Sequence, residues 1–264
     1  MTERYGDRIF TQTRDDEATR LEQLAATYDP ITRSQLARLP LPRTARCLDV
    51  GAGSGTIVRW LAEHRPDGRI VAVDRDTRLL APLPQRYPQV RVCRMDITRD
   101  AWSDDERFDL IHARFVLMHL PDRLAVLKQL VSLLAPGGWL VLSDSIDLTT
   151  ASARHPAYRA VMTAMWEALR RSIGTEIEWV RDTPLLLRNA GLVDVGCSAH
   201  LPSIDHRSSV ARFWRLTLLQ MRDDIIGTGL VDETVFEQGI AAFTDPEVTE
   251  LSPGMCTTWG RLPG

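Results

Sequence analysis

Three glycines at alternate positions stand where an apolar run of the chain gives way to a helical one. They lie in the stretch Leu48-Asp49-Val50-Gly51-Ala52-Gly53-Ser54-Gly55. Glycine adopts left-handed backbone conformations at no steric cost and lets the main chain approach a ligand closely. Because these glycines separate a predicted strand from a predicted helix, they indicate a nucleoside cofactor lying against bare backbone.

Acidic residues follow the next two predicted strands. Asp74 ends the first of them, where a carboxylate can accept hydrogen bonds from both hydroxyls of a ribose. Its alternative role is to cap the helix that follows. Asp96 comes after the second strand, beside Ile97. This pair suits an adenine, whose amine would donate to the carboxylate, although aspartate after a strand is also common turn chemistry.

The elements that must position these residues alternate between strand and helix. The strand-like runs are 46–50, 69–74, 90–95, 109–113 and 139–144. The segment 120–135 predicts a helix that ends at Pro136-Gly137-Gly138. The residues on its predicted apolar face are Leu124, Leu127, Val131 and Leu134. This alternation predicts a parallel sheet with helices on both faces.

The flanking segments are mostly helical. Residues 1–42 form a helical lead-in or lid, and 43–264 form the core with helical cap segments at about 148–192 and 202–254. Within the later part, the predicted helices are 155–173, 176–190, 208–226 and 232–243, and the predicted strands are 192–200 and 255–262. The cap segments carry large apolar side chains that can roof an acceptor pocket or pack the cap's own core. They are Trp166, Trp179, Phe213, Trp214, Met221 and Phe236.

Composition restricts the partners of this chain. Its 264 residues have a net charge of −3, which argues against nucleic acid or an anionic membrane as the main partner. None of its four cysteines stands in C-x-x-C spacing, and all lie in apolar strand-like runs, which indicates small buried residues in a reducing compartment. The first residues lack an apolar signal region. We therefore expect a cytoplasmic protein, and an oligomer such as a homodimer is compatible with the sequence.

In order and spacing, the motifs resemble those of class I S-adenosylmethionine-dependent methyltransferases. The matching segments cover about residues 45–145 and are the glycine stretch, Val73-Asp74, Met95-Asp96-Ile97, Phe108-Asp109-Leu110-Ile111-His112-Ala113-Arg114, His119-Leu120-Pro121-Asp122 and Leu133-Leu134-Ala135-Pro136-Gly137-Gly138-Trp139-Leu140. The resemblance implies a Rossmann-like α/β fold, with a seven-stranded, mostly parallel sheet whose last strand, 255–262, is antiparallel. It also implies S-adenosylmethionine as cofactor and S-adenosylhomocysteine as product.

The resemblance also implies roles for particular residues. Asp49 and the glycine loop would lie at the methionine end of the cofactor, and the main chain around Ala113 and Arg114 would receive its amino group. Asp74 would bind the ribose, and Asp96 with Ile97 the adenine. Arg20, on a helix like the one that precedes the core in small-molecule methyltransferases, would reach the cofactor carboxylate, or it is an exposed surface arginine. The full expected cofactor-binding set is Asp49, Gly51, Ala52, Gly53, Gly55, Asp74, Arg75, Asp96, Ile97, Ala113, Arg114 and Arg20.

A nicotinamide-binding Rossmann domain is the chief competing interpretation. That fingerprint takes Gly or Ala at its sixth position, where this chain has the β-branched Thr56. No Tyr-x-x-x-Lys pair surrounds Lys128, which is the chain's single lysine. The phosphate-binding G-x-x-x-x-G-K loop is absent as well. These departures favour the methyltransferase.

The residues after the fourth predicted strand narrow the acceptor to a small molecule. They lack the Asn/Asp-Pro-Pro-aromatic stretch of amino-directed DNA enzymes and the paired glutamates of protein arginine enzymes, and no Pro-Cys dipeptide occurs. Catechol-type enzymes hold magnesium with carboxylates after two strands. Here Asp144 and Asp147 follow the fifth strand without a partner after the fourth, so we predict no metal.

We therefore expect methyl transfer to oxygen or nitrogen of a small, partly apolar molecule, with carbon as a further option, consistent with secondary metabolism. His119 and His206 are the candidates for a general base, and each has an ordinary structural role as its alternative. Three other functions stay open. They are a cofactor-bound cyclase or rearrangement enzyme that transfers no methyl group, an NAD(P)-dependent oxidoreductase, and a non-catalytic protein that binds the cofactor.

Overall fold

The computed structural model describes residues 5–11, 16–100, 102 and 106–264. Its contacts divide the chain into two compact units. The sheet unit comprises Asp29–Asp144, Glu178–Ala199 and Cys256–Gly264. The helical unit comprises Met1–Tyr28, Ser145–Ile177 and His200–Met255. None of the helices in the described ranges is long and apolar enough to cross a lipid bilayer.

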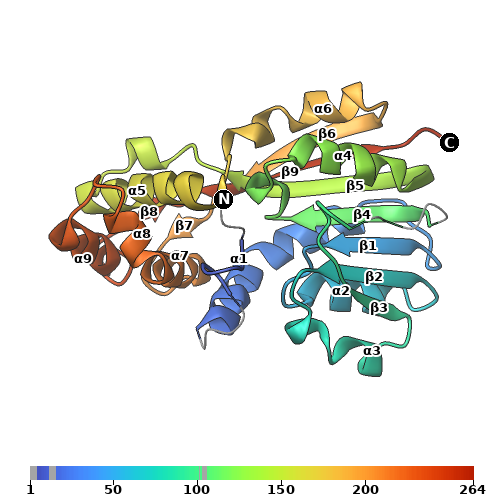
Figure 1. Ribbon diagram of the computed structural model, residues 1–264, viewed down its shortest axis with the longest axis horizontal. Coiled ribbons are helices and arrows are strands. Elements are labelled where there is room, and N and C mark those ends of the chain that lie inside the picture. Colours follow the sequence, from blue (N-terminus) through green and yellow to red (C-terminus); the bar gives the residue numbers. More distant parts are fainter. Residues whose placement is uncertain (1–4, 12–15, 101, 103–105) are drawn as a thin grey trace. The chain divides into compact units, whose positions relative to one another are not determined.

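The sheet has seven strands in the order β3-β2-β1-β4-β5-β9-β6 (Figure 1). Their bounds are β1 Arg46–Val50, β2 Arg69–Asp74, β3 Val90–Arg94, β4 Phe108–Arg114, β5 Leu134–Ile146, β6 Val193–His200 and β9 Gly254–Arg261. The first five strands pair in parallel, and the last strand along the chain, β9, is antiparallel. The predicted Rossmann-like sheet is confirmed.

The central strands are apolar because both of their faces are covered. In β1 and β2, four consecutive residues of each strand are buried. Strands buried on both sides have near-continuous apolar sequences instead of alternating ones. Both strands therefore begin and end at the residues that their sequences predicted.

Short helices flank the sheet strands. They are α2 Thr56–His64, α3 Leu83–Arg86, α4 Arg123–Ser132 and α6 Thr183–Asn189, with single 3-10 turns η1 Arg78–Leu80, η2 Leu117–His119 and η4 Glu178–Arg181. Helix α2 follows the glycine loop directly. It buries Ile57, Val58 and Leu61 in a core shared with residues of β1 and β2. This packing fixes the direction in which the loop leaves the sheet.

The prediction for α4 is wrong in its bounds and in its buried face. The helix begins at Arg123, because the turn η2 precedes it, and it ends at Ser132. Leu124, predicted to be buried, is 52% exposed. Leu134 already belongs to β5, as does Pro136-Gly137-Gly138. The residues that α4 buries are Val126, Leu127 and Leu130.

The helical unit has its own apolar core. Its helices are α5 Pro156–Ile173, α7 Ser209–Gln220, α8 Arg222–Ile226, α9 Glu233–Ala242 and the part of α1 Glu17–Ala37 up to Tyr28. The turn η3 Thr150–Ser152 and a two-stranded sheet, β7 Ser203–Ile204 with β8 Glu250–Leu251, complete it. The cap aromatics Phe213, Trp214 and Phe236 pack in this core, with Met221.

Two predicted helices are interrupted. The segment predicted as 208–226 divides at Met221 into α7 and α8. The segment predicted as 176–190 divides into η4 and α6, where Pro184 occupies the first turn of α6. At each break one helical element ends and the next one begins.

Residues 178–192, which the sequence analysis assigned to a cap segment, are part of the sheet unit. The Trp179 indole N–H donates to Asp144 Oδ2 at 3.1 Å, and the Thr183 hydroxyl lies 2.7 Å from that of Thr258 on β9. These buried polar contacts join η4 and α6 to the edge half of the sheet.

Candidate functional site

The three glycines of the loop after β1 all have left-handed backbone. Their φ angles are +67° at Gly51, +54° at Gly53 and +73° at Gly55. L-residues with side chains adopt this region only at a cost, so the loop conformation itself requires glycine. The amides of Gly51 and Ala52 both donate to the Val73 carbonyl, at 2.8 and 3.1 Å, which ties the loop to the end of β2.

Space around the loop distinguishes the glycines from one another. A Cβ built on Gly51 would lie 2.3 Å from Val116 Cγ2, and one on Gly55 would lie 2.6 Å from Leu83 Cδ1. A Cβ on Gly53 would meet nothing nearer than the Gly51 carbonyl oxygen, at 4.0 Å. Gly51 and Gly55 therefore pack against protein, whereas the Gly53 main chain presents an open face that a ligand can approach.

Asp74 lies beside this open backbone. Its Oδ2 accepts a hydrogen bond from the Gly53 amide at 2.8 Å, and its Oδ1 accepts one from the Asp76 amide at 3.0 Å. Burial raises the pKa of Asp74, and the two backbone donors partly offset that rise. A carboxylate offers about four acceptor sites, so both oxygens retain capacity for further donors such as ribose hydroxyls.

Asp96 and Arg75 come together from the ends of β3 and β2. Arg75 Nε lies 3.8 Å from Asp96 Oδ2. Asp96 Oδ1 accepts from the amide and the hydroxyl of Thr98, at 3.0 and 2.6 Å, so the turn role considered for this residue is present in the structure. The neighbouring Ile97 is buried. The arrangement holds a carboxylate and an apolar side chain at one strand end.

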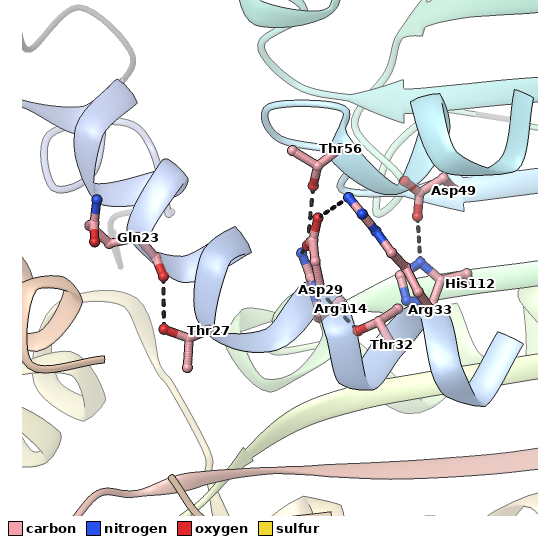
Figure 2. Close-up of polar contacts among 9 residues, drawn as sticks. All are labelled: Gln23, Thr27, Asp29, Thr32, Arg33, Asp49, Thr56, His112 and Arg114. Atoms are coloured by element: carbon pink, nitrogen blue, oxygen red, sulfur yellow. Dashed lines mark hydrogen bonds and ion pairs between the residues drawn. The ribbon is translucent and has the colours of Figure 1, made fainter. Parts of the chain in front are cut away.

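Asp49 forms a buried pair with a histidine that the sequence analysis did not single out. His112 on β4 lies opposite Asp49 in the register with β1, and His112 Nδ1 donates to Asp49 Oδ1 at 2.6 Å (Figure 2). The two residues are 1% and 3% exposed. Within the described chain, the buried Nε2 of His112 has no hydrogen-bond partner. The available signal was a single polar residue inside the apolar stretch of each of two adjacent strands, 47–50 and 110–113.

Arg114, at the end of β4, is held by the second half of α1. Its Nη2 donates to Asp29 Oδ1 at 2.8 Å, and its Nη1 donates to the Thr32 hydroxyl at 3.0 Å (Figure 2). Asp29 is buried and also accepts from the Thr56 hydroxyl at 3.2 Å and from Arg33 at 2.9 Å. The Arg114 side chain is thus committed to structure, which leaves its main chain, and that of Ala113, as the groups for a ligand.

The loop after β4 is strained and anchored by one carboxylate. Phe115 has a φ of +55°, and its amide donates to the Ser143 carbonyl at 2.7 Å. The next amide, of Val116, donates to Asp144 Oδ1 at 3.0 Å. Positive φ at a bulky residue persists only where the surroundings impose it. Asp144 therefore fixes the backbone that carries Val116 over Gly51.

Asp144 should make stability depend on pH. Burial raises its pKa to about 7, and the N–H donors offset this only in part. The native state then holds this proton more tightly than the unfolded chain does. The stabilisation that the protonated Asp144 gives the native state is therefore complete below about pH 4, and it is lost as pH rises through about 7. Relative to Asp144→Asn, we expect the wild-type unfolding free energy to fall by about 2 kcal/mol between pH 5 and pH 8.

Urea unfolding of both proteins at several pH values measures this difference. The exposed Asp67 provides the matched control, since Asp67→Asn should differ from wild type by a constant amount over the same range. A constant difference for Asp144→Asn as well would mean that the buried carboxyl is already ionised at pH 5.

The predicted bases and Arg20 are divided between the two units. His119 ends the turn η2 in the sheet unit, and His206, 3.5 Å from Asp205, belongs to the helical unit. Arg20 also lies in the helical unit, where it is 3% exposed and its Nε donates to Glu17 Oε2 at 2.7 Å. The alternative of an exposed surface arginine is therefore wrong, and a role for Arg20 toward the cofactor stays a prediction.

No metal-binding arrangement occurs within the part of the chain that is described, where no three His, Cys, Asp or Glu groups gather. Asp144 and Asp147, the carboxylates considered for magnesium, are both occupied by N–H donors. Trp179 donates to Asp144, and the Trp166 indole N–H donates to Asp147 Oδ2 at 2.7 Å. Each carboxylate therefore accepts a hydrogen bond from a tryptophan indole within the fold.

Comparison with known proteins places this geometry in a family. A family model described as a methyltransferase domain matches residues 21–192, more than half of the chain. "Methyltransferase str2" of Strobilurus tenacellus is 32% identical over 161 residues, which cover 60% of this chain and 57% of that protein. A trans-aconitate 2-methyltransferase of Variovorax paradoxus is 38% identical over 127 residues, 48% of each chain. The matches span about half the length of these relatives.

The fold has solved counterparts. The structure of Haemonchus contortus phosphoethanolamine N-methyltransferase 2 in complex with S-adenosyl-L-methionine matches with a TM-score of 0.60 at 15% identity, covering 98% of this chain and 59% of that chain. At this identity the likeness shows the fold alone. Together with the family match and the glycine loop, it leads to one conclusion: the chain belongs to the class I S-adenosylmethionine-dependent methyltransferases.

Proposed function

We propose that this protein transfers a methyl group from S-adenosylmethionine to an oxygen or nitrogen of a small, partly apolar molecule. The observation that carries the proposal is the open main chain of Gly53, with its left-handed φ and with Asp74 hydrogen-bonded to its amide. A backbone that no side chain covers, beside a partly buried carboxylate, suits the ribose and methionine portions of a nucleoside sulfonium.

The residues that would hold the cofactor lie in the sheet unit, except for Arg20, which belongs to the helical unit. Asp74 would accept from the ribose hydroxyls, and Asp96 with Ile97 would face the adenine. Asp49, oriented by His112, would lie toward the methionine end. The main chain at Ala113 and Arg114 would receive the amino group. When bound, S-adenosylmethionine supplies a methyl carbon activated by its positively charged sulfur.

The protein's own contribution is then alignment and exclusion of water, because the displacement is in line on an activated carbon. A general base is needed only where the acceptor must lose a proton. His119 is the candidate in the sheet unit and His206 the one in the helical unit. A relative whose name gives trans-aconitate as its acceptor supports a small-molecule acceptor here.

We place the reaction in the cytoplasm, where thiols are kept reduced. All four cysteines are free thiols, which supports this location. Secondary metabolism is compatible with the small acceptor that we propose. A monomer or a homodimer would serve equally, because the proposed cofactor residues come from a single chain.

Calorimetry and mass spectrometry test the proposal together. We expect S-adenosylhomocysteine to bind with a micromolar dissociation constant, and we expect an accepted substrate to gain one methyl group. Binding of NAD(H) without binding of S-adenosylhomocysteine would overturn the proposal in favour of an oxidoreductase. Turnover of a substrate in the presence of the cofactor with no gain in mass would replace it with a cyclase or rearrangement enzyme.

A further inference from the structure

Two cysteines far apart in the sequence lie side by side at the edge of the large sheet. Cys197 is on the edge strand β6 and Cys256 is on its neighbour β9. Their Sγ atoms are 3.2 Å apart. Cys197 is exposed, whereas Cys256 is buried. A disulfide bond has an S–S length of about 2.05 Å, so the two sulfurs need to approach by only about 1 Å to bond.

The surroundings of the pair make the two sulfurs unequal. The Cys256 thiol and the Thr258 hydroxyl, 3.6 Å away, donate to Cys197 Sγ, and the first of these contacts is the larger cause of a Cys197 pKa lowered to about 6. The same contact, with burial, raises the pKa of Cys256. The lowered pKa favours the thiolate form of the accessible sulfur, and thiolates are the nucleophiles of cysteine chemistry.

The other two cysteines lack these features. Cys47 is fully buried, and burial raises the pKa of its thiol to about 12. Cys93 is half-buried on β3, and the described contacts place no second sulfur beside it. The chain thus offers one reactive pair and two internal controls.

The pair also brackets one continuous part of the helical unit. Cys197 lies three residues before the segment His200–Met255, and Cys256 follows that segment directly. A bond between the two sulfurs would close the chain into a loop that contains the whole segment. Closing a long loop removes conformational freedom from the unfolded chain.

We propose that Cys197 and Cys256 form a peroxide-sensitive, reversible disulfide, independently of the methyl-transfer function. The Cys197 thiolate attacks an oxygen of hydrogen peroxide, the O–O bond breaks, and hydroxide leaves, so that Cys197 becomes a sulfenic acid. The Cys256 sulfur then attacks Cys197 Sγ, the S–O bond breaks, and water leaves with the Cys256 proton. Two thiols lose two electrons, which reduce one peroxide to two waters. A dithiol reductant reverses the reaction by exchange.

Hydrogen peroxide titration of the purified full chain tests the proposal. We expect free thiols counted in denaturant to fall from four to two, the intact mass to fall by about 2 Da, and digestion to yield a peptide linked through Cys197 and Cys256. The melting temperature should rise by about 5 °C or more on oxidation and return on reduction.

Variants separate the two sulfurs. Cys256→Ser should accumulate a sulfenic acid at Cys197 that dimedone traps, and Cys197→Ser should resist oxidation, while the control Cys93→Ser should still form the linked peptide. The proposal fails if the linked peptide joins other cysteines. It also fails if the wild-type protein passes to sulfinic acid without cross-linking, or if its four thiols survive a peroxide excess that oxidises a free thiol standard.

Discussion

Replacing Gly53 with alanine should weaken S-adenosylhomocysteine binding by about a hundredfold, or about 2.7 kcal/mol. The added methyl group meets no protein atom nearer than the Gly51 carbonyl oxygen, at 4.0 Å, so it projects into the open face of the loop. There it would hold the cofactor away from the backbone that it is proposed to touch. The variant must also place alanine at a φ of +54°, which costs about 1 kcal/mol of stability.

Gly137 supplies the matched control for this experiment. It has a φ of +78°, and a Cβ built on it also meets nothing within 4 Å, but it lies near the start of β5, away from the loop. Gly137→Ala should therefore lose a similar amount of stability in urea unfolding and bind the ligand normally in calorimetry. Equal affinities for the two variants would show that no ligand approaches Gly53.

Replacing Asp74 with alanine should weaken the binding of the same ligand by about 150-fold, or about 3 kcal/mol. Two hydrogen bonds from ribose hydroxyls to a carboxylate contribute about 1.5 kcal/mol each, and both would be lost. The Gly53 amide would also lose its acceptor, which loosens the loop. Asp74→Asn retains one acceptor oxygen, so its affinity should lie between those of wild type and Asp74→Ala.

Asp76 is the control for Asp74 because it is acidic, close in sequence and paired with Arg78 at the surface. The contact of Asp76 with Asp74 Oδ1 is made by its backbone amide, which the substitution retains. Asp76→Ala should therefore change the affinity less than about twofold. Titration calorimetry at one pH and salt concentration measures all of these variants. Wild-type affinity in Asp74→Ala would show that the ribose lies elsewhere.

The sequence predicted the parts of the fold that depend on local pattern. Buried parallel strands are runs of apolar residues, so the bounds of β1 and β2 agree with the prediction. The buried face predicted for α4 does not agree with the structure: a 3-10 turn precedes the helix, which begins only at Arg123, and Leu124 is exposed. The breaks at Met221 and Asp182 were missed because helical periodicity continues across a kink.

For the site as well, the sequence predicted the features that depend on local spacing and missed the contacts between distant segments. Spacing along the chain was enough to place the glycine loop, Asp74 and Asp96 at neighbouring strand ends. It could not pair His112 with Asp49, since that contact depends on the register of two strands 63 residues apart. Nor could it find Asp29, whose contacts with Thr56 and Arg114 join three elements that no periodic pattern relates.

The contact between Gly51 and Val116 limits how this chain can diverge. A methyl group at position 51 would lie 2.3 Å from Val116 Cγ2, and the backbone there has a φ of +67°. Any lineage that acquires a side chain at position 51 must first shorten the one at position 116. The reverse order passes through a protein whose loop cannot close. Position 116 can therefore change to a smaller residue while Gly51 is kept, whereas a change at position 51 depends on the residue already present at 116.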